Sequence, residues 1–294
     1  MSVKKKVFKT VGLFTSSSNQ NAYSIGEQIE EILSYKDITV LYDSSFSSLR
    51  KINKLKTHSK KYISDTADLV IAIGGDGAML GCSREYGSQN IPILGINLGK
   101  LGFLTDIAPD EITSKLLEVL DGKYVVDKRF FLETKINNKK RNFLALNEVV
   151  IHSGTIAKLI EFDLFIDKKF VYRQKADGLI INSPTGSTAY SLSGGGPIVH
   201  PSLDAITLLP MFPHSLSSSP LIINANSSVQ VSLVDGSSAA QLSFDSHNFI
   251  NLEGQNEINI CKSKSMLELL HPLDHDFYDG CRNKLGWSSG ITKP

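Results

Sequence analysis

The feature that most constrains the fold is a short apolar run, "LVIAI" at residues 69–73, followed directly by "GGDG" at 74–77. The run is rich in β-branched residues and closed by glycine, which is typical of a strand buried on both faces of a sheet. The next segment, "AMLGCSREYG" at 78–87, begins with helix-forming residues and ends at a glycine stop signal. The glycines are therefore predicted to join the carboxyl end of a strand to the first turn of a helix.

Such a junction is suited to an anion, because free backbone N–H groups and the positive end of the helix dipole converge there. Asp76 places a negative charge in that field. Besides a plain tight turn, three roles are open for Asp76: a helix cap, a ligand for Mg²⁺ carried by a phosphate, or a general base beside a phosphoryl donor. The quartet matches neither the P-loop nor the dinucleotide fingerprint, so it decides nothing alone.

Strand and helix patterns alternate over residues 1–125. Strands are predicted at 7–15, 38–43, 69–73 and 91–97, and helices at 21–35, 78–87 and 109–122. This alternation predicts an α/β domain with a Rossmann-like parallel sheet, whose ligands bind at the carboxyl ends of the strands. Both "GGDG" and "NLGKLGFL", residues 97–104, follow such ends.

Beyond residue 125 the helical period largely disappears. Short alternating or β-branched segments lie at 130–136, 141–153, 158–167, 169–175, 177–183, 220–225, 227–235, 239–245 and 256–263. They predict a mainly β domain over 126–270. The tail, 271–294, is predicted to be helical in part and to pack back on the first domain.

The composition argues against several partners. A formal net charge of +1, from 31 basic and 30 acidic residues, creates no overall field for nucleic acid or an anionic membrane. The apolar part of the N-terminus stops after "VGLF", too short for a signal peptide, and no run approaches a membrane span. Cys82, Cys261 and Cys281 form no CxxC pair, which fits a reducing compartment, so a cytoplasmic protein is expected.

Two other site types are weakly supported. The segment "HPLDH" at 271–275 places two histidines four residues apart, but Pro272 and the missing glutamate argue against a metalloprotease motif. Ordinary polar contacts and no protein-bound metal are expected there. A serine hydrolase is set aside because the chain has no GxSxG elbow.

A second glycine-rich segment, residues 175–216, departs from the strand pattern around it. Its hydroxyl residues include Ser183, Thr185, Ser187, Thr188, Ser191 and Ser193. Hydroxyl and backbone donors suit ribose and phosphate oxygens, and Tyr190 offers a face on which a base can stack. The alternative is a surface loop, but a long loop with so little charge more often belongs to a site.

Together these segments resemble the NAD kinase family, whose members phosphorylate NAD to NADP. The resemblance rests on "GGDG", "GINLGKLGFLTDI", "LNEVVIH", "DGLIINSPTGSTAYSLSGGGPI" and "MFPHSL", in this order, and extends from about residue 70 to the closing "KLGW". The quartet alone is shared with diacylglycerol, sphingosine and phosphofructokinase relatives. The Asn-Glu pair together with "SPTGSTAYS" is much more specific.

The resemblance implies a role for each matching residue. Asp76 matches the catalytic aspartate, Gly74 and Gly75 belong to the loop that admits ATP phosphates, and Gly77 lies at the substrate ribose. Asn147 and Glu148 match the pair that holds a nucleoside ribose. Further positions expected to bind the dinucleotide are Lys158, Lys175, Asp177, Thr188, Ala189, Tyr190, Ser191, Leu192, Ser193 and His247. His247 stands where glutamine is usual, Ser219 where arginine is common, and Ala78 where threonine or asparagine is frequent.

The implied reaction is phosphorylation of the adenosine 2′-hydroxyl of NAD by ATP, with Asp76 accepting the hydroxyl proton. Mg²⁺ would enter with ATP rather than through protein ligands. The resemblance also implies a homo-oligomer, dimer or tetramer, with sites at subunit contacts. Two alternatives stay open: a lipid or sphingoid kinase, which would need a large apolar cavity, and a dinucleotide-binding sensor or oxidoreductase that transfers no phosphate.

Overall fold

The computed structural model describes residues 8–16, 20–48, 55–99, 102–137, 139–154, 158–215, 219–234, 240–252 and 257–287. The chain divides into two compact units, the first formed by residues 1–128 with 267–294 and the second by residues 129–266. Two long strands, β6 (Val125–Ile136) and β17 (Glu257–His271), contribute residues to both units. Among the residues described, no helix is both long and apolar enough to span a membrane.

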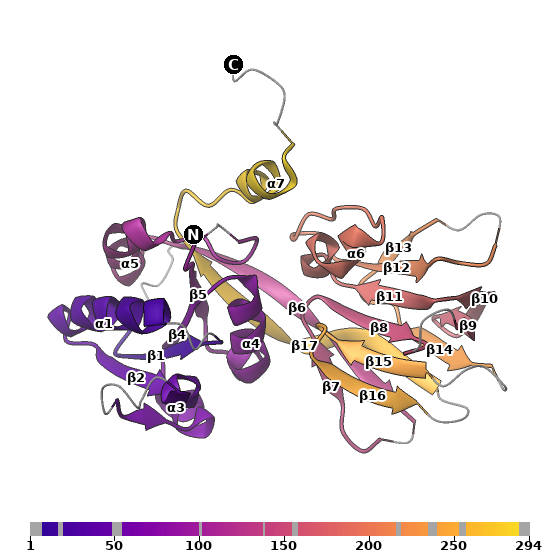
Figure 1. Ribbon diagram of the computed structural model, residues 1–294, viewed down its shortest axis with the longest axis horizontal. Coiled ribbons are helices and arrows are strands. Elements are labelled where there is room, and N and C mark those ends of the chain that lie inside the picture. Colours follow the sequence, from indigo (N-terminus) through magenta and orange to yellow (C-terminus); the bar gives the residue numbers. More distant parts are fainter. Residues whose placement is uncertain are drawn as a thin grey trace. The chain divides into compact units, whose positions relative to one another are not determined.

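The first unit is built on a parallel sheet with the strand order β17-β5-β4-β1-β2-β3, in which all neighbouring strands run parallel (Figure 1). Its other strands are β1 (Thr10–Thr15), β2 (Thr39–Asp43), β3 (Thr57–His58), β4 (Leu69–Ile73) and β5 (Ile93–Ile96). Its α-helices are α1 (Gln20–Tyr35), α3 (Lys60–Thr66), α4 (Asp76–Tyr86), α5 (Ile112–Leu120) and α7 (Phe277–Leu285). Short 3₁₀ turns lie at Ser44–Ser48, Gly87–Gln89 and Pro109–Glu111.

Helices cover both faces of this sheet, which explains why β4 is apolar throughout. Leu13 and Ile71 share a core with the apolar stripes of α1 and α5. On the opposite face, Gly12 leaves room for Ile63 of α3 beside Val70 of β4. Every residue of β4 is therefore buried. The order of β3, β2, β1, β4 and β5 is that of a doubly wound fold, and "GGDG" lies at the carboxyl end of β4.

The second unit consists of two antiparallel sheets. In one sheet β10, β9, β14 and β17 are neighbours, with β6 pairing β17 and β7; the other has the order β13-β12-β11-β8-β15-β16. The bounds are β7 (Phe143–Ala145), β8 (Glu148–His152), β9 (Ile160–Ile166), β10 (Lys169–Ala176), β11 (Gly178–Asn182), β12 (Ala205–Met211), β13 (Leu221–Asn224), β14 (Val229–Leu233), β15 (Ala240–Phe244) and β16 (Asn248–Leu252). A 3₁₀ turn, η4 (Thr185–Thr188), and the short helix α6 (Tyr190–Ser193) follow β11.

The two sheets of this unit share one apolar core. Alternate residues of β9 and β14 point inward, and Phe162, Leu164 and Val231 pack with Ile151 and Leu179 of the other sheet. This alternation is the pattern that antiparallel strands show when one face is buried. The predicted fold class, a Rossmann-like α/β domain followed by a mainly β domain, is confirmed.

Two segments differ from the predicted elements. Residues 205–211 lie inside the glycine-rich segment but form β12, an apolar strand that pairs with β11 on one side and β13 on the other. In the first unit, α4 begins at Asp76 rather than at Ala78, so Asp76 is the first helical residue and not part of the preceding loop.

Candidate functional site

The glycine quartet makes a sharp turn between β4 and α4. The Gly74 N–H donates to the carbonyl of Ile96 on the neighbouring strand (2.8 Å), and Gly74 has a φ of +148°. A Cβ on Gly74 would lie 2.5 Å from that of Ala78, so the turn requires glycine there. By contrast, Gly75 and Gly77 are exposed with open space where a Cβ would stand, which leaves room for a ligand to approach the backbone.

The Asp76 carboxylate accepts three hydrogen bonds. Oδ1 accepts the N–H of Leu104 (3.0 Å), and Oδ2 accepts the N–H of Phe103 (3.0 Å) and the Lys284 ammonium (2.7 Å). The N-cap position of α4 is Gly75, and no side chain caps that helix. The carboxylate therefore holds a distant loop and a distant helix instead of capping α4.

The loop that follows β5 reaches Asp76 because of Gly102. A Cβ at Gly102 would lie 2.1 Å from the Asp76 Oδ1 atom. Thr105 holds the loop in place, because it is fully buried and accepts a hydrogen bond from the Asn97 side chain (2.9 Å). Glycine is thus needed for the close approach, and the two backbone donors to Asp76 are fixed in place.

Lys284 was not predicted as a site residue. It lies in the last turn of α7, and its ammonium is also 4.9 Å from the centre of the Phe103 ring. Asp276 caps the start of this helix by accepting the N–H of Tyr278 (2.9 Å). The predicted tail helix therefore brings a cation to the glycine quartet.

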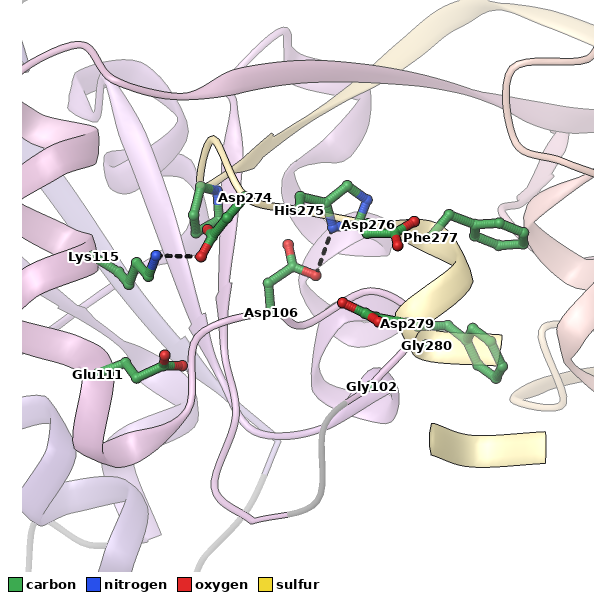
Figure 2. Close-up of a pocket in the computed structure, with 12 residues that line it drawn as sticks. Gly102, Asp106, Glu111, Lys115, Asp274, His275, Asp276, Phe277, Asp279 and Gly280 are labelled. Atoms are coloured by element: carbon green, nitrogen blue, oxygen red, sulfur yellow. Dashed lines mark hydrogen bonds and ion pairs between the residues drawn. The ribbon is translucent and has the colours of Figure 1, made fainter. Parts of the chain in front are cut away.

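The segment that leads into α7 is fastened to the same loop. Asp106 accepts from Nδ1 of both His271 and His275, the latter at 3.0 Å, and the two rings stack with centres 3.9 Å apart. Figure 2 shows the bond between His275 and Asp106. Burial favours the neutral carboxyl, but the two histidines outweigh it and lower the pKa of Asp106. Burial alone would lower the pKa of His271, and its carboxylate neighbours Asp106 and Asp127 raise it instead.

A pocket of about 130 Å³ lies beside this cluster. Figure 2 shows the carboxylates of Asp106, Asp274 and Asp279 around it, with Lys115 paired to Asp274 (2.5 Å). Asp106, His271 and His275 each offer one atom that could ligate a metal ion, and these atoms lie within 4.8 Å of one another. Asp106 already hydrogen-bonds to both histidines. We take the cluster as the anchor of the segment before α7.

In the second unit, Asn147 and Glu148 lie at the start of β8 and are both buried. Their position is set by Asp245, whose carboxylate accepts the N–H groups of Asn147 (2.8 Å), Glu148 (3.2 Å) and the preceding Leu146 (2.9 Å). Asp245 lies in the turn after β15 and has a φ of 49°. This residue was not predicted, since nothing local links it to a pair almost one hundred positions earlier.

Glu148 is buried in an unusual state. Only 2% of the residue is exposed, and among the described residues Oε2 has no hydrogen-bond partner. Burial raises the pKa of Glu148 to about 8, and the negative charge of Asp245 contributes to a smaller extent. A hydrogen bond from the backbone N–H of Tyr190 opposes this shift. A buried carboxyl with a vacant oxygen is costly, and it is a feature expected of a ligand-binding group.

The glycine-rich segment folds across this pair. Gly186 passes so close that a Cβ would lie 2.2 Å from the carbonyl oxygen of Asn147. The hydroxyls of Ser183 and Ser187 bond to backbone groups (Leu146 carbonyl and Pro184 carbonyl), and that of Thr185 accepts from Arg129. These three hydroxyls therefore support the fold, contrary to the expectation that they face a ligand.

The predicted residues of α6 differ in exposure. Tyr190 is 42% exposed, whereas Ser191 is buried and its Oγ has no hydrogen-bond partner among the described residues. Thr188, Ala189 and Leu192 are half-buried, and Ser193 is exposed.

A pocket of about 480 Å³ in the second unit brings Asp177 and Tyr190 together. The other lining residues are Val150, His152, Ser153, Gly154, Met211, Ser243, Ser246 and Phe249. None of these eight was singled out from the sequence, although His152 lies in the "LNEVVIH" segment. Burial lowers the pKa of His152, which accepts the Gly154 N–H at Nδ1.

Of the predicted residues of the second unit, only Asp177 and Tyr190 line this pocket. Lys158 is exposed, and Lys175 pairs with Glu161 at 3.4 Å. His247 is exposed in the turn next to Ser246. Asp76, Gly74, Gly75 and Gly77 belong to the first unit.

Comparison with known proteins identifies the family. Residues 11–124 match the model of the ATP-NAD kinase N-terminal domain, and residues 146–271 match that of the ATP-NAD kinase C-terminal domain. NAD kinase from Azotobacter vinelandii is 42% identical over 288 residues, which cover 97% of this chain and 98% of that protein. NAD kinase from Saccharophagus degradans is 43% identical over 286 residues, covering 96% and 97%. The chain therefore belongs to the NAD kinase family.

Solved structures agree with this assignment. Yeast NADH kinase complexed with NADH has a TM-score of 0.88 and 26% identity, with 98% of this chain and 91% of that chain covered. An NAD kinase from Archaeoglobus fulgidus in complex with ATP has a TM-score of 0.73 at 24% identity, covering 94% and 97%, and supports the fold.

The buried carboxyl of Glu148 predicts a pH-dependent stability. Its pKa rises from 4.5 to about 8 on folding, so the folded chain holds a proton that the unfolded chain releases, and stability falls as pH rises between these values. Glu148→Gln removes that penalty. The free energy of unfolding of the variant relative to wild type should increase by roughly 2 to 4 kcal/mol between about pH 5 and pH 8.5. Denaturant titrations at several pH values test this, and a difference between variant and wild type that stays constant from about pH 5 to pH 8.5 would contradict it.

Proposed function

We propose that the chain transfers the γ-phosphate of ATP to the adenosine 2′-hydroxyl of NAD, giving NADP, with Asp76 accepting the proton of the attacking hydroxyl. ATP-dependent phosphorylation of NAD is the activity of the family to which the chain belongs. The observation that carries the role of Asp76 is its position, a carboxylate on the first residue of α4 between two exposed glycines. Phosphoryl transfer needs an acceptor for the hydroxyl proton next to a cradle for phosphate, and this turn offers both.

We infer that Mg²⁺ enters with ATP as part of the substrate. Asp76 already accepts three hydrogen bonds, which leaves it a poor member of a protein cage for the ion. Mg²⁺ commonly keeps several waters and binds through substrate phosphates, which suits a site with one carboxylate. The ion would neutralise phosphate charge, and the chain's own contribution would be the exposed glycine backbone and the dipole of α4.

The pocket of the second unit is our candidate for the dinucleotide. The ring of Tyr190 offers a stacking face, and the vacant oxygen of buried Glu148 suits a ribose hydroxyl. Asn147 directly precedes β8 and Asp177 directly precedes β11, at opposite ends of this antiparallel pair, and both would contribute polar contacts. We assign the further dinucleotide contacts to Thr188, Ala189, Ser191, Leu192 and Ser193, and weaker ones to Lys158, Lys175 and His247. The crystal structure of yeast NADH kinase with NADH supports a dinucleotide ligand.

One assay separates this proposal from its alternatives. Purified protein is incubated with ATP, Mg²⁺ and NAD, and NADP is measured. NADP formation is expected. Failure to form NADP with any phosphate donor would favour a dinucleotide sensor, and phosphorylation of a lipid or sphingoid base instead would favour that class of kinase.

Substitution of the proposed base gives the sharpest test of its role. Asp76→Asn keeps the size of the side chain but cannot accept a proton at neutral pH. Its amide has a single acceptor oxygen, so one of the backbone N–H groups of Phe103 and Leu104 loses its acceptor. We expect kcat to fall by about 10² to 10⁴ while NAD binding persists. Added Mg²⁺ should not restore activity, whereas a lost metal ligand would be partly compensated. Turnover near that of wild type would refute the assignment of Asp76 as the base.

Tyr190 tests the dinucleotide pocket. Tyr190→Ala should raise the KM for NAD by roughly 5- to 150-fold, the range expected when about 1 to 3 kcal/mol of base stacking is lost. The KM for ATP should change much less. Equal losses for both substrates would mean that the ring only supports the surrounding loop.

We also propose a cytoplasmic homo-oligomer, dimer or tetramer. The cytoplasmic location is supported by three free thiols, Cys82, Cys261 and Cys281, which fit a reducing compartment. Self-association is supported by large exposed apolar side chains on the edge strands of the second unit, Phe170 on β10 and Ile222 on β13, at 59% and 50% exposure. Light scattering across a dilution series should give two or four times the chain mass, and a monomer at every concentration would contradict this.

A further inference from the structure

The ion pair between Asp76 and Lys284 conflicts with a free general base. A carboxylate that accepts a proton needs an oxygen available to the attacking hydroxyl. Oδ2 already accepts from both Phe103 and Lys284, whereas Oδ1 accepts from Leu104 and has Gly102 packed so closely against it that a Cβ there would lie 2.1 Å away. Because Oδ1 is crowded by the loop, we take Oδ2 as the oxygen that serves the substrate, and one of its two donors has to leave first.

The backbone donors cannot be the ones that leave. Phe103 and Leu104 are held next to Asp76 by the close approach of Gly102 and by the buried Thr105 beneath them. Moving them would break the loop that follows β5. Lys284 differs, because its donor sits at the end of a long side chain.

The ion pair itself is easily exchanged. The side chains of Lys284 and Asp76 are each 30% exposed. Pairs of this kind contribute little to stability, since water screens the charges and both side chains lose freedom. A ligand with more negative charge than one carboxylate would outcompete Asp76 for the ammonium.

The position of Lys284 indicates which kind of anionic ligand would displace it from Asp76. Its ammonium lies at the start of α4, where the helix dipole and the open backbone of Gly75 and Gly77 favour an anion. Without nucleotide, Asp76 supplies the negative charge for both the dipole and the lysine. A polyphosphate bound at the glycines would offer several oxygens to the same ammonium, and lysine is a common phosphate ligand.

The fold places Lys284 there with little freedom. Gly280, in the middle of α7, packs so closely on Phe103 that a Cβ would lie 3.3 Å from the ring. The segment before α7 is tied to Asp106 by His275, and Asp106 follows the same loop. The helix is therefore anchored before its start and at its middle to the loop that holds Asp76, and only the lysine side chain has to move.

We propose that Lys284 is a donor-phosphate ligand that rests on Asp76 until ATP binds. Binding of the triphosphate draws the ammonium from Oδ2 to phosphate oxygens, and this exchange frees the carboxylate to accept the hydroxyl proton. Asp76 thus becomes available when the phosphate donor is present. The role as a switch rests on the proposed kinase function, whereas the phosphate contact itself does not.

A double-mutant cycle on ATP affinity tests the exchange. ATP binding with Mg²⁺ and without NAD is measured by calorimetry for wild type, Asp76→Asn, Lys284→Met and the double variant. Lys284→Met should weaken ATP binding by about 10- to 100-fold, as for loss of a charge-assisted hydrogen bond. Asp76→Asn should tighten ATP binding when Lys284 is intact, because the lysine no longer has to be displaced. The tightening should be several-fold smaller when Asp76→Asn is combined with Lys284→Met, where only the general loss of negative charge remains.

Matched controls separate phosphate binding from support of the helix. Arg282→Met removes ion pairs on the same helix with Asp276 and Asp279 and does not reach Asp76, so ATP affinity should stay within twofold of wild type. Lys284→Arg should retain most of the ATP affinity, whereas Lys284→Gln should resemble Lys284→Met. In turnover, Lys284→Met should raise the KM for ATP much more than that for NAD.

Three results would overturn the proposal. They are an ATP affinity of Lys284→Met within twofold of wild type, equal rises in both KM values, or weaker ATP binding by Asp76→Asn when Lys284 is intact. The last result would mean that Asp76 positions the lysine and does not compete for it, and it decides the matter even where the Lys284→Met variant folds poorly. If wild type forms no NADP but the cycle behaves as expected, the proposed function fails and the phosphate contact stands.

Discussion

The Asp76 carboxylate is the interaction on which the proposed chemistry of the first unit depends. It accepts two backbone N–H groups from the loop after β5 and the ammonium of α7. Three segments far apart in the chain thereby meet at the carboxyl end of β4. The parallel sheet supplies the rigid base, because β4 is buried on both faces and ends in a turn that only glycine permits at Gly74. Few groups could replace this carboxylate without loosening the loop.

The second unit also uses a carboxylate to hold backbone N–H groups of a distant segment. Asp245 holds the backbone of Asn147 and Glu148, while the Glu148 side chain is left with a vacant oxygen. Its raised pKa means that near neutral pH much of the carboxyl population is neutral, and a neutral carboxyl can donate as well as accept hydrogen bonds. Such a group suits a ribose, whose hydroxyls do both. The buried carboxyl of Glu148 lowers the stability of the fold, as groups kept for function often do.

The sequence was sufficient for the fold class and for the local motifs. Period and glycine placement located β4, α4 and the strands of the second unit other than β12 and β16, because these depend on neighbouring residues. Partners that depend on distant residues were missed. Lys284 lies 208 positions from Asp76, and Asp245 lies 97 from Glu148, and neither distance leaves a mark in local pattern. The error at β12 arose similarly, since its apolar run followed a glycine-rich loop and was assigned to it.

The two carboxyl groups differ in what a ligand must do. Asp76 has one donor too many, so the donor nucleotide has to remove one. Glu148 has one partner too few, so the acceptor nucleotide has to add one. Without the triphosphate, Lys284 would stay on Asp76, and an attacking hydroxyl would meet an occupied carboxylate. The order of events is then set by electrostatics, because in our proposal the triphosphate bound at the glycines is the ligand that takes the lysine. Proton acceptance is therefore coupled to the presence of the phosphate that the hydroxyl must attack.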